Sequence, residues 1–397
     1  MTMKIAIVHD YLVNRGGAER VVAVLHRIFP DAPIFTGLYA PDATYPEFAS
    51  ADVRPSKLQK WLRDPEDFRR LAPLMPRAFR RMKIEGFDVV LSSTSGFAHG
   101  VKPKSGCHIA YTYTPPRFLW DDGYERANAV PAPLRPFSGL AVRALRRGDR
   151  RAAARPHFTV AISKVAAERV RAIYGREATI IHPPVETGMF GIAPNTKDEF
   201  LLVSRLLTYK NVDVAINAFN QMGRRLIIVG DGPARAGLQA LAGPTIEFRG
   251  VVDDAELVRL YGRCRGTILA ASEDFGLTPL EANASGRPVI ALRAGGAEET
   301  VIDGTTGVLF SPSNPLALAD GVARAISTTF DPAALRAHAE QFGVDAFAGK
   351  LRAYIEQSRR ACMTCHRTRR AEKIRHLRAI PRHSEEDGPR DAAVKAP

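Results

Sequence analysis

The stretch LLVSRLLTYKNVDVAI, residues 201–216, contains one complete strand-to-helix unit. A short apolar run ends at Ser204, a basic loop follows, and apolar residues then recur at helical spacing through residues 211–222. When such a unit repeats, it predicts a parallel sheet that helices cover on both faces. This stretch therefore predicts an α/β fold.

The same unit repeats along both halves of the chain. The short apolar runs predicted as strands are 4–8, 87–91, 107–111, 157–162, 178–181, 200–204, 225–230, 245–249, 267–271, 288–292 and 307–310. Two prolines in HPPVETGMF (182–190) fix an extended joint between the two series. We expect two facing Rossmann-like domains with a deep interdomain cleft, because ligands of open α/β sheets bind beyond the C-terminal ends of the strands.

The sequence divides into four predicted segments. Residues 1–182 form the first domain and residues 183–343 the second, followed by a helix over 344–360. Residues 361–397 are polar, basic and without periodicity, so we expect a disordered tail there.

The composition limits the classes of protein to which this chain can belong. The chain has 397 residues, of which 45% are hydrophobic and 25% charged, as is typical of a globular protein. No apolar run is long enough to cross a bilayer, and the start MTMKIAIVHD lacks the apolar region of a secretory signal, so we expect a cytoplasmic location. Four cysteines are too few and too scattered for a disulfide framework. The CMTCH run at 362–366 matches the haem attachment pattern, but we favour a chance match and expect no haem or metal.

The net charge of +14 is concentrated in two segments. Residues 56–83 hold nine basic and three acidic residues, and residues 359–397 hold eleven and five. Such charge suits an anionic membrane surface or solubility, whereas nucleic acid is disfavoured because no recognised binding motif accompanies it. Within 69–86, arginines alternate with apolar residues, which predicts a helix in a membrane interface, while Pro73 and Pro76 favour a solvated loop. The apolar residues are Leu71, Leu74, Met75, Phe79 and Met82.

The first predicted strand is followed by two glycines. In HDYLVNRGGAERVV (9–22), Gly16 and Gly17 precede a helix that begins near Ala18. The free backbone N–H groups of such a helix start can bind an anion, although a glycine-rich helix start without a ligand is equally compatible. The pattern is not G-x-G-x-x-G, which disfavours a nicotinamide-dependent enzyme.

Basic and glycine-rich loops follow two strands of the second half. Arg205 and Lys210 flank the loop after Ser204, and two cations beside a helix start suit a pyrophosphate. The run IIVGDGP (227–233) ends another strand in a turn at Gly230, at the same edge of the sheet.

The stretch EDFGLTPLEANASGRP, residues 273–288, places Glu273 and Glu281 eight positions apart. An alternative that needs no ligand is a capping box with Thr278 as N-cap, Pro279 at N1 and Glu281 at N3. That alternative leaves Glu273 unexplained. No D-x-D motif occurs, so a metal-clamped pyrophosphate is not expected. The backbone N–H groups available at this helix start belong to Gly276, Leu277 and Thr278.

Together, these motifs resemble glycosyltransferase family 4, a family of retaining enzymes of the GT-B fold that use nucleotide sugars. The resemblance covers residues 3–355 and rests on GGAER, SRLLTYKN, VGDGP, EDFGLTPLEANASGRPVIA and AGGAEETVIDGTTGVLF in this order. TPPRFLWD (114–121) is most similar to the subgroup of bacterial polysaccharide mannosyltransferases. The resemblance implies that the first domain binds the acceptor, that the second binds the nucleotide sugar, and that the last long helix crosses back to the first domain.

The resemblance also implies roles for single residues. Glu273 would lie near the donor sugar, Glu281 would hold the ribose hydroxyls, and Arg205 and Lys210 would bind the diphosphate. We therefore expect Glu273, Arg205 and Lys210 to be catalytic. The expected donor-binding residues are Gly16, Gly17, Arg205, Lys210, Gly230, Gly276, Leu277, Thr278 and Glu281.

One position departs from the pattern of the subgroup. Tyr113 stands where these mannosyltransferases often carry a histidine that touches the donor sugar. His99, in SSTSGFAHG, is a candidate substitute, and a structural histidine is the alternative. Tyr113, His99 and Arg117 are thus the candidate sugar or acceptor contacts.

The resemblance implies transfer of a hexose, with mannose favoured, from a nucleotide sugar such as GDP-mannose to a polysaccharide or a lipid-linked oligosaccharide. No metal or other cofactor is expected, and the basic segments suggest a peripheral position on the inner face of the cell membrane. A nucleotide-sugar epimerase of the same architecture is the alternative function. A non-catalytic scaffold at the membrane is disfavoured, because Glu273, Arg205 and Lys210 are all present.

Overall fold

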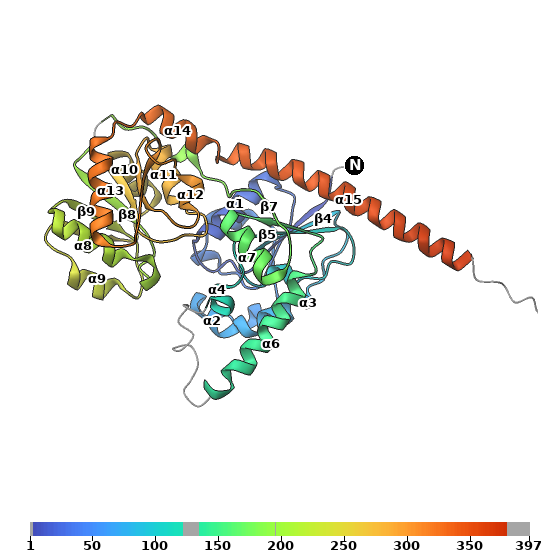
Figure 1. Ribbon diagram of the computed structural model, residues 1–397. Helices are drawn as coiled ribbons and strands as arrows, with labels where there is room; N and C mark the ends of the chain where they lie inside the picture. The colour runs from blue at the N-terminus through green and yellow to red at the C-terminus, as the bar shows by residue number, and fades with distance from the viewer. Residues whose placement is uncertain (1–2, 122–134, 195, 379–397) are drawn as a thin grey trace, which may run out of the picture.

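The computed structural model describes residues 3–121, 135–194 and 196–378, which form two α/β domains (Figure 1). The first domain is built on a seven-stranded sheet with the order β3-β2-β1-β4-β5-β6-β7, in which neighbouring strands are parallel. Its strands are β1 (Ile5–His9), β2 (Ile34–Thr36), β3 (Val53–Pro55), β4 (Val89–Thr94), β5 (Cys107–Thr112), β6 (Phe158–Ala161) and β7 (Thr179–Ile180).

Helices of different lengths cover this sheet. The first, α1, buries one apolar side that includes Val21, Leu25 and Ile28. In α7, the Ser163 hydroxyl caps the N-terminus by accepting the Ala166 N–H, and Gly175 ends the helix in the left-handed conformation. The helices are α1 (Gly17–Ile28), α2 (Phe68–Leu71), α3 (Met75–Arg81), α4 (Arg117–Trp120), α6 (Arg135–Ala153) and α7 (Lys164–Tyr174).

The second domain is built on a six-stranded parallel sheet with the order β10-β9-β8-β11-β12-β13. Its strands are β8 (Glu199–Val203), β9 (Arg225–Val229), β10 (Ile246–Gly250), β11 (Gly266–Leu269), β12 (Val289–Leu292) and β13 (Gly307–Phe310). Its helices are α8 (Val212–Met222), α9 (Arg235–Leu241), α10 (Asp254–Arg263), α11 (Thr278–Ala284), α12 (Ala297–Thr300), α13 (Pro315–Ser327) and α14 (Pro332–Glu340).

The predicted fold class is confirmed, because each apolar run predicted as a strand overlaps a strand of one of the two parallel sheets. Strands β1, β4 and β5 are buried along their whole length, as expected of parallel strands covered on both faces. The sequence missed β2 and β3. Each has only three residues, which is too short for a periodic signal, and β3 is an edge strand with exposed positions.

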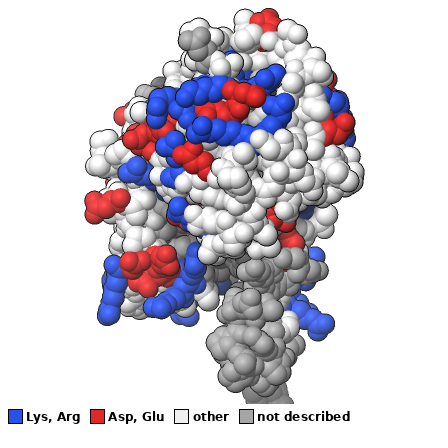
Figure 2. Space-filling model, turned by 90° about the vertical axis from the view of Figure 1, so that its left-hand side faces the viewer, with Lys and Arg blue, Asp and Glu red and all other residues white. Residues whose placement is uncertain are grey.

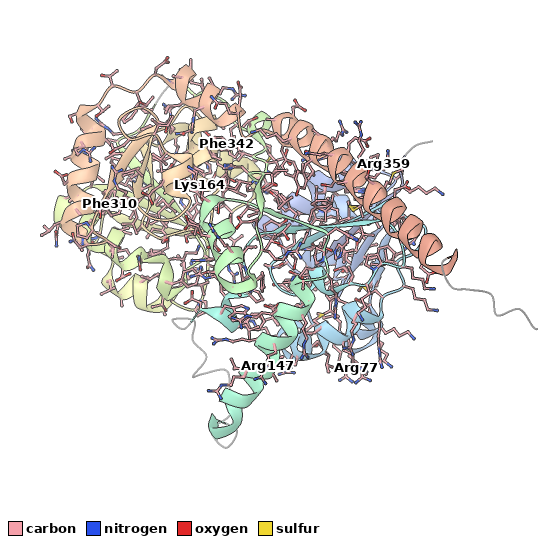
Figure 3. The ribbon with its side chains drawn as sticks, turned by 45° about the vertical axis from the view of Figure 1, so that its right-hand side comes forward. Arg77, Arg147, Lys164, Phe310, Phe342 and Arg359 are labelled. Atoms are coloured by element: carbon pink, nitrogen blue, oxygen red, sulfur yellow. A yellow bond between two sulfur atoms is a disulfide. The ribbon has the colours of Figure 1, made fainter. Side chains whose placement is uncertain are left out.

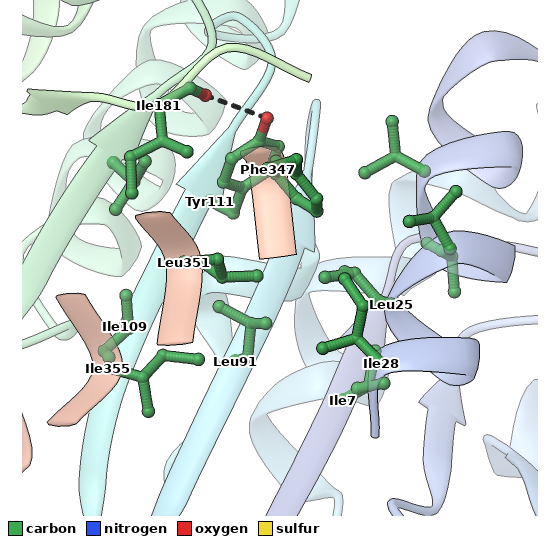
Figure 4. Close-up of a cluster of buried hydrophobic side chains, with 14 of the residues drawn as sticks. Ile7, Leu25, Ile28, Leu91, Ile109, Tyr111, Ile181, Phe347, Leu351 and Ile355 are labelled. Atoms are coloured by element: carbon green, nitrogen blue, oxygen red, sulfur yellow. Dashed lines mark hydrogen bonds between the residues drawn. The ribbon is translucent and has the colours of Figure 1, made fainter. Parts of the chain in front are cut away.

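A long helix, α15 (Val344–Arg378), leaves the second domain and runs across the first (Figure 1). Its side chains Phe347, Leu351 and Ile355 belong to the same buried cluster as Tyr111 of β5 (Figure 4). The Tyr111 hydroxyl donates a hydrogen bond of 3.0 Å to the carbonyl oxygen of Ile181 in the segment that joins the domains. The core of the first domain therefore includes residues from the far end of the chain.

The structure corrects the expected end of this helix. The sequence predicts that the helix ends at residue 360, whereas α15 continues to Arg378. Residues 361–378 contain no glycine or proline, so a helix that is anchored by packing can continue through them despite their polar composition. The rest of the expected tail, 379–397, lies outside the described residues, as do the side chains of Cys365 and His366 in the CMTCH run.

Cys107 of β5 and Cys362 of α15 form a disulfide, which the sequence analysis did not expect. The two residues are 255 positions apart, and their Cα atoms lie 5.8 Å apart because α15 returns to the first sheet. Figure 3 shows sulfur in yellow beside α15, close to Arg359. The fold therefore brings together two cysteines that lie far apart in the sequence.

The basic segment 69–86 does not form the free interfacial helix that the sequence suggested. Short helices α2 and α3 follow one another, and Pro73 and Pro76 both occupy first-turn positions, where proline is tolerated. Met75 and Phe79 are fully buried in the core, while Arg77 and Arg80 are exposed. The apolar residues of α3 thus pack inward, and the arginines remain at the surface.

Candidate functional site

The loop between β8 and α8 brings Arg205 and Lys210 to the C-terminal edge of the second sheet. Arg205 is exposed and makes no ion pair with any residue that the structure describes. Lys210 Nζ instead donates to Glu273 Oε1, which lies in the loop after β11. Two sequence-predicted residues, Lys210 and Glu273, are therefore in direct contact.

The loop after β9 packs against this basic loop. The Leu206 N–H donates a 2.9 Å hydrogen bond to the Asp231 carbonyl. Gly230 has φ of 127°, and a Cβ there would overlap the carbonyl oxygen of Ser204. Only glycine permits this approach. Gly230 thus holds the two loops together, and its contact with a donor stays a prediction.

The backbone of Glu273 is fixed by the loop that follows β12. The Gly296 N–H donates a 2.8 Å hydrogen bond to the Glu273 carbonyl, and a Cβ on Gly296 would overlap the backbone of Phe275. Gly276 adopts φ of 81°, so the chain turns sharply before α11. These contacts hold the Glu273 carboxylate beside Lys210.

The capping box proposed for α11 is wrong. The helix begins one residue earlier than expected, with Leu277 as N-cap and without a side-chain cap, so Glu281 is the fourth helical residue rather than the third. Its side chain is buried, and Glu281 Oε2 accepts a 2.8 Å hydrogen bond from the Tyr261 hydroxyl. Burial raises the pKa of the Glu281 carboxyl, while Arg20 and the Tyr261 hydrogen bond oppose this rise.

The glycine-rich loop of the first domain lies opposite α11. Gly16 is the N-cap of α1 and provides no side chain to satisfy the first-turn N–H groups. The Cβ position of Gly17 lies 3.7 Å from Leu277 Cδ1. Arg20, one turn farther along α1, lies 3.6 Å from Glu281 Oε1. The structure therefore brings Gly16, Gly17, Leu277 and Glu281 to one place between the domains.

A second set of contacts joins the domains at Asp274, which the sequence analysis did not single out. Its carboxylate pairs with Arg169 of α7, and its carbonyl accepts a 2.5 Å hydrogen bond from the Ser163 hydroxyl. Burial raises the pKa of the Asp274 carboxyl, which Arg169 and Arg117 counteract. Asp274 directly follows Glu273 in the sequence, and this position is the feature that could have identified it as a candidate site residue.

Arg117 lies beside the basic loop of the other domain. Its guanidinium stacks over the Tyr209 ring at 4.8 Å, and it pairs with Asp121 at 3.1 Å. This cation–π contact holds Arg117 against the loop that carries Lys210. Arg117 thus lies at the domain boundary, where a sugar or acceptor contact was predicted.

Tyr113 and His99 differ in their surroundings. The Tyr113 hydroxyl donates a 3.1 Å hydrogen bond to the Ala18 carbonyl and lies 2.8 Å from Ser93 Oγ, so it supports the start of α1. His99 is buried between Thr94 and Asp149. The His99 Nε2 lies 3.2 Å from the Asp149 carboxylate. A structural role accounts for His99, and sugar contact by either residue stays a prediction.

Asp10 is a buried residue of the same edge that the sequence analysis missed. It directly follows β1, and its carboxylate accepts N–H hydrogen bonds of 2.7, 2.7 and 2.6 Å from Ser95, Phe97 and Ala98. Asp10 therefore shapes the loop that follows β4. The sequence feature that could have identified Asp10 is its position directly after a buried strand.

Contacts between the domains occupy part of the expected cleft. Besides Arg20–Glu281 and Arg169–Asp274, the Lys164 N–H donates a 2.8 Å hydrogen bond to Glu299. The site is therefore a boundary crossed by ion pairs, with the C-terminal strand ends of both domains turned toward it.

The fold and the convergence of loops at this boundary define a two-domain architecture of the GT-B type. Sucrose-phosphate synthase from Thermosynechococcus elongatus has a similar structure, with a TM-score of 0.69, 18% identity, and coverage of 90% of this chain and 99% of that chain. Anabaena Alr3699/HepE in complex with UDP-glucose is similar with a TM-score of 0.68 and 20% identity, over 90% of this chain and 100% of that one. At these identities the likeness shows the fold.

Sequence comparison points to glycosyltransferases. The family model Glycosyl transferases group 1 matches residues 190–342, which is most of the second domain. A GDP-mannose-dependent alpha-(1-6)-phosphatidylinositol monomannoside mannosyltransferase of Mycolicibacterium smegmatis is 28% identical over 48% of this chain and 58% of its own length. Glycogen synthase of Mycobacterium tuberculosis is 34% identical over 41% of this chain and 42% of its own length. The chain thus spans about half the length of the curated relatives it matches.

Proposed function

We propose that the protein is a retaining glycosyltransferase of family 4 that transfers a hexose from a nucleotide sugar. The observation that carries this proposal is the cluster of Arg205, Lys210 and Glu273 at the C-terminal edge of the second sheet, with Glu281 close by and the Gly16–Gly17 loop opposite. The match of the group 1 family model to the same domain supports the proposal.

In this proposal the diphosphate of the donor binds Arg205 and Lys210. Arg205 is exposed and has no described counter-ion, so it can bind a phosphate without breaking a bond within the protein. Lys210 is held in place by Glu273, which limits the conformational freedom lost on binding. The uncapped N-terminus of α1 contributes further N–H donors from the opposite domain.

The ribose of the donor binds the Glu281 carboxylate. Tyr261 holds one carboxylate oxygen, and Arg20 lies near the other. A ribose hydroxyl can donate to the oxygen that faces Arg20, where a charged acceptor makes a hydrogen bond roughly twice as strong as a neutral one.

Transfer then proceeds on one face of the sugar. The acceptor hydroxyl attacks the anomeric carbon from the side that the diphosphate leaves, and the departing diphosphate takes the proton. Arg205 and Lys210 stabilise the charge that develops on the diphosphate, and the Glu273 carboxylate stabilises positive charge on the sugar. No side-chain nucleophile or metal ion is required in this scheme.

We favour mannose as the sugar and GDP-mannose as the donor, with a polysaccharide or lipid-linked oligosaccharide as acceptor. The relative that acts with GDP-mannose on a phosphatidylinositol mannoside supports this choice. The TPPRFLWD segment contributes Arg117, which the structure places at the domain boundary. A nucleotide-sugar epimerase is not favoured, because both the family model and the curated relatives are glycosyltransferases.

Peripheral association with an anionic membrane is a further part of the proposal. None of the described helices combines the length and apolarity that a membrane span requires. On the side of the second domain, basic and acidic side chains lie intermingled (Figure 2). Arg77 and Arg147 lie at the lower margin of the first domain, and Arg359 lies on α15 (Figure 3). Positive charge on the first domain and α15 is what supports attraction to anionic lipid.

A donor screen with purified protein tests the proposal. We expect GDP-mannose to raise the melting temperature more than UDP-glucose or ADP-glucose at equal concentration, because a ligand that binds the folded state more tightly stabilises it more, by RT ln(1 + [L]/Kd). Incubation without acceptor separates the alternatives. A transferase releases little nucleotide and leaves the sugar unchanged, whereas appearance of a second nucleotide sugar would establish an epimerase.

A further inference from the structure

Two sulfur atoms and an imidazole converge at the edge of the first sheet opposite the candidate donor site. Cys107 is the first residue of β5, His157 directly precedes β6, and Cys362 lies on α15. One sulfur or nitrogen atom from each lies within 4.8 Å of the other two. Cys107 and Cys362 are 1% and 7% exposed, whereas His157 is exposed. This cluster lies at the N-terminal ends of the strands, so the proposed transfer reaction does not use it.

The hydrogen bond of His157 distinguishes sulfur chemistry from metal binding. Its Nδ1 accepts the His108 N–H at 2.9 Å, so the neutral ring carries its proton on Nε2. A metal would need a nitrogen lone pair, yet one nitrogen is engaged as an acceptor and the other is protonated. Histidines that bind zinc usually donate a hydrogen bond from their second nitrogen, which is the opposite arrangement.

Two surface cavities border His157, whose ring lies beside the two sulfur atoms. One, of about 230 Å³, is lined by residues that include Lys102, His108 and Arg155. The other, of about 220 Å³, is lined by residues that include Arg176. Burial lowers the pKa of His108 to about 3, and the positive charges of Arg155 and Arg176 contribute to this shift. Positive surroundings stabilise thiolates and attract anions.

We propose that the Cys107–Cys362 disulfide is a thiol–disulfide exchange site that accepts a small anionic thiol. The thiolate of the reductant attacks Sγ of Cys362, the less deeply buried of the two residues, and forms a mixed disulfide with it. The bond between the two protein sulfurs breaks, and Cys107 leaves as a thiolate. A second reductant thiolate then attacks the mixed disulfide, releasing the oxidised reductant and the Cys362 thiolate.

The state of this bond affects both domains. The disulfide closes a loop that contains the whole second domain, since the chain leaves the first domain near Ile181 and returns through α15. When the bond is reduced, side-chain packing such as that of Phe347 and Leu351 and the hydrogen bond from Arg352 to the Ile28 carbonyl still hold α15 on the first domain. Reduction therefore lowers stability and loosens the second connection between the domains.

Reduction rates of the full chain test the charge requirement. The quantity to measure is the rate of reduction by glutathione, which is anionic, divided by the rate of reduction by neutral 2-mercaptoethanol. We expect this rate ratio to be higher at low salt than at high salt, because salt screens the attraction of an anion. Lys102→Gln should lower this rate ratio by about 1.5- to 5-fold, the effect of one exposed charge. Lys104→Gln is the matched control, because Lys104 pairs with Glu85 and does not line the cavity. An unchanged ratio in Lys102→Gln would overturn the preference for an anionic thiol.

Mapping of the bond tests the site itself without a variant that could misfold. We expect digestion of the unreduced protein to yield one peptide pair that joins residues 107 and 362, and reduction to lower the melting temperature by about 5 °C or more. Cys365→Ser should retain both results. Free thiols at residues 107 and 362, a bond that disappears in Cys365→Ser, or zinc bound in equimolar amount and released by a thiol reagent would each overturn the proposal.

Discussion

Arg20 of α1 and Glu281 of α11 form an ion pair across the domain boundary, with 3.6 Å between Nη1 and Oε1. Arg20 also lies 3.6 Å from Asp254 and donates a 3.3 Å hydrogen bond to the Tyr45 hydroxyl. Glu281, in turn, is bonded to Tyr261. The carboxylate proposed to bind ribose is thus already paired to a cation of the other domain, so donor binding and domain contact involve the same group.

Glu281→Gln should weaken donor binding and change folding stability little. Glutamine can still accept the Tyr261 hydroxyl, and loss of the charge removes the cost of keeping a buried carboxylate ionised. The donor KM should rise about 10-fold, while the free energy of unfolding changes by about 1 kcal/mol or less. Tyr261→Phe is the matched variant and should cost about 1–2 kcal/mol of stability, because it removes the donor to a buried carboxylate. An unchanged KM in Glu281→Gln would leave this residue with a structural role alone.

Arg205→Ala and Lys210→Ala should each lower kcat/KM by about 10- to 100-fold, because each removes a charge-assisted contact of about 1.5–3 kcal/mol. Their effects on stability should differ. Arg205 has no described partner, whereas loss of Lys210 leaves Glu273 without its counter-ion. Arg224→Ala is the control, since Arg224 pairs with Asp198 at the opposite edge of the same sheet. Normal kinetics in both site variants would refute the diphosphate assignment.

Glu273→Gln should reduce kcat by about 10- to 100-fold without raising the donor KM. The carboxylate stabilises positive charge that exists only in the transition state, so its loss acts on turnover. The glutamine oxygen can still accept a hydrogen bond from Lys210 Nζ, so Lys210 stays in position to bind the diphosphate. Steady-state kinetics separate the two parameters, and a higher KM with normal kcat would place Glu273 in ground-state binding instead.

The sequence predicted the fold because buried parallel strands are continuous apolar runs. It also singled out Glu273, Glu281, Arg205, Lys210 and the glycine loop as candidates, because the turn after a strand and the start of a helix leave local patterns. All of these residues lie at the strand ends that face the domain boundary.

The contacts between domains could not be predicted in the same way. Arg20–Glu281, Arg169–Asp274 and the Cys107–Cys362 pair each join residues more than 100 positions apart. Nothing in their local sequence records a partner. The false capping box has a different cause, since the helix starts one residue earlier than expected and Glu281 is therefore its fourth residue and not its third.

The basic surface of the first domain should bind anionic vesicles in a salt-dependent manner. Each exposed Lys or Arg near an anionic membrane contributes about 1 kcal/mol at low salt. Arg77→Gln with Arg80→Gln should therefore lower vesicle binding by about 30-fold at low salt. Arg224→Gln with Arg265→Gln makes the same change in charge on the second domain and should have little effect. Co-sedimentation with and without anionic lipid is the measurement, and equal binding to neutral vesicles would rule out electrostatic attraction.

His182, in the segment joining the domains, should make stability fall in acid. Its ring stacks on Phe275 at 5.1 Å, and its Nε2 lies 3.6 Å from Glu299. Burial, followed by the positive charges of Lys350 and Lys164, lowers the pKa of His182 from 6.5 to about 4. Between these two pH values the unfolded chain binds a proton that the folded protein does not, so stability is lost as the pH falls from 6.5 to 4.

The expected loss at His182 is about 1 kcal/mol, because the ring is partly exposed and solvent screens its neighbours. His182→Phe keeps an aromatic ring against Phe275 and cannot be protonated. Its free energy of unfolding should therefore depend less steeply on pH between 6.5 and 4, measured by urea titration at several pH values. Carboxylates titrate in the same range in both proteins, so the difference between the two curves isolates His182. Parallel curves would show that His182 is protonated equally in the folded and unfolded chain.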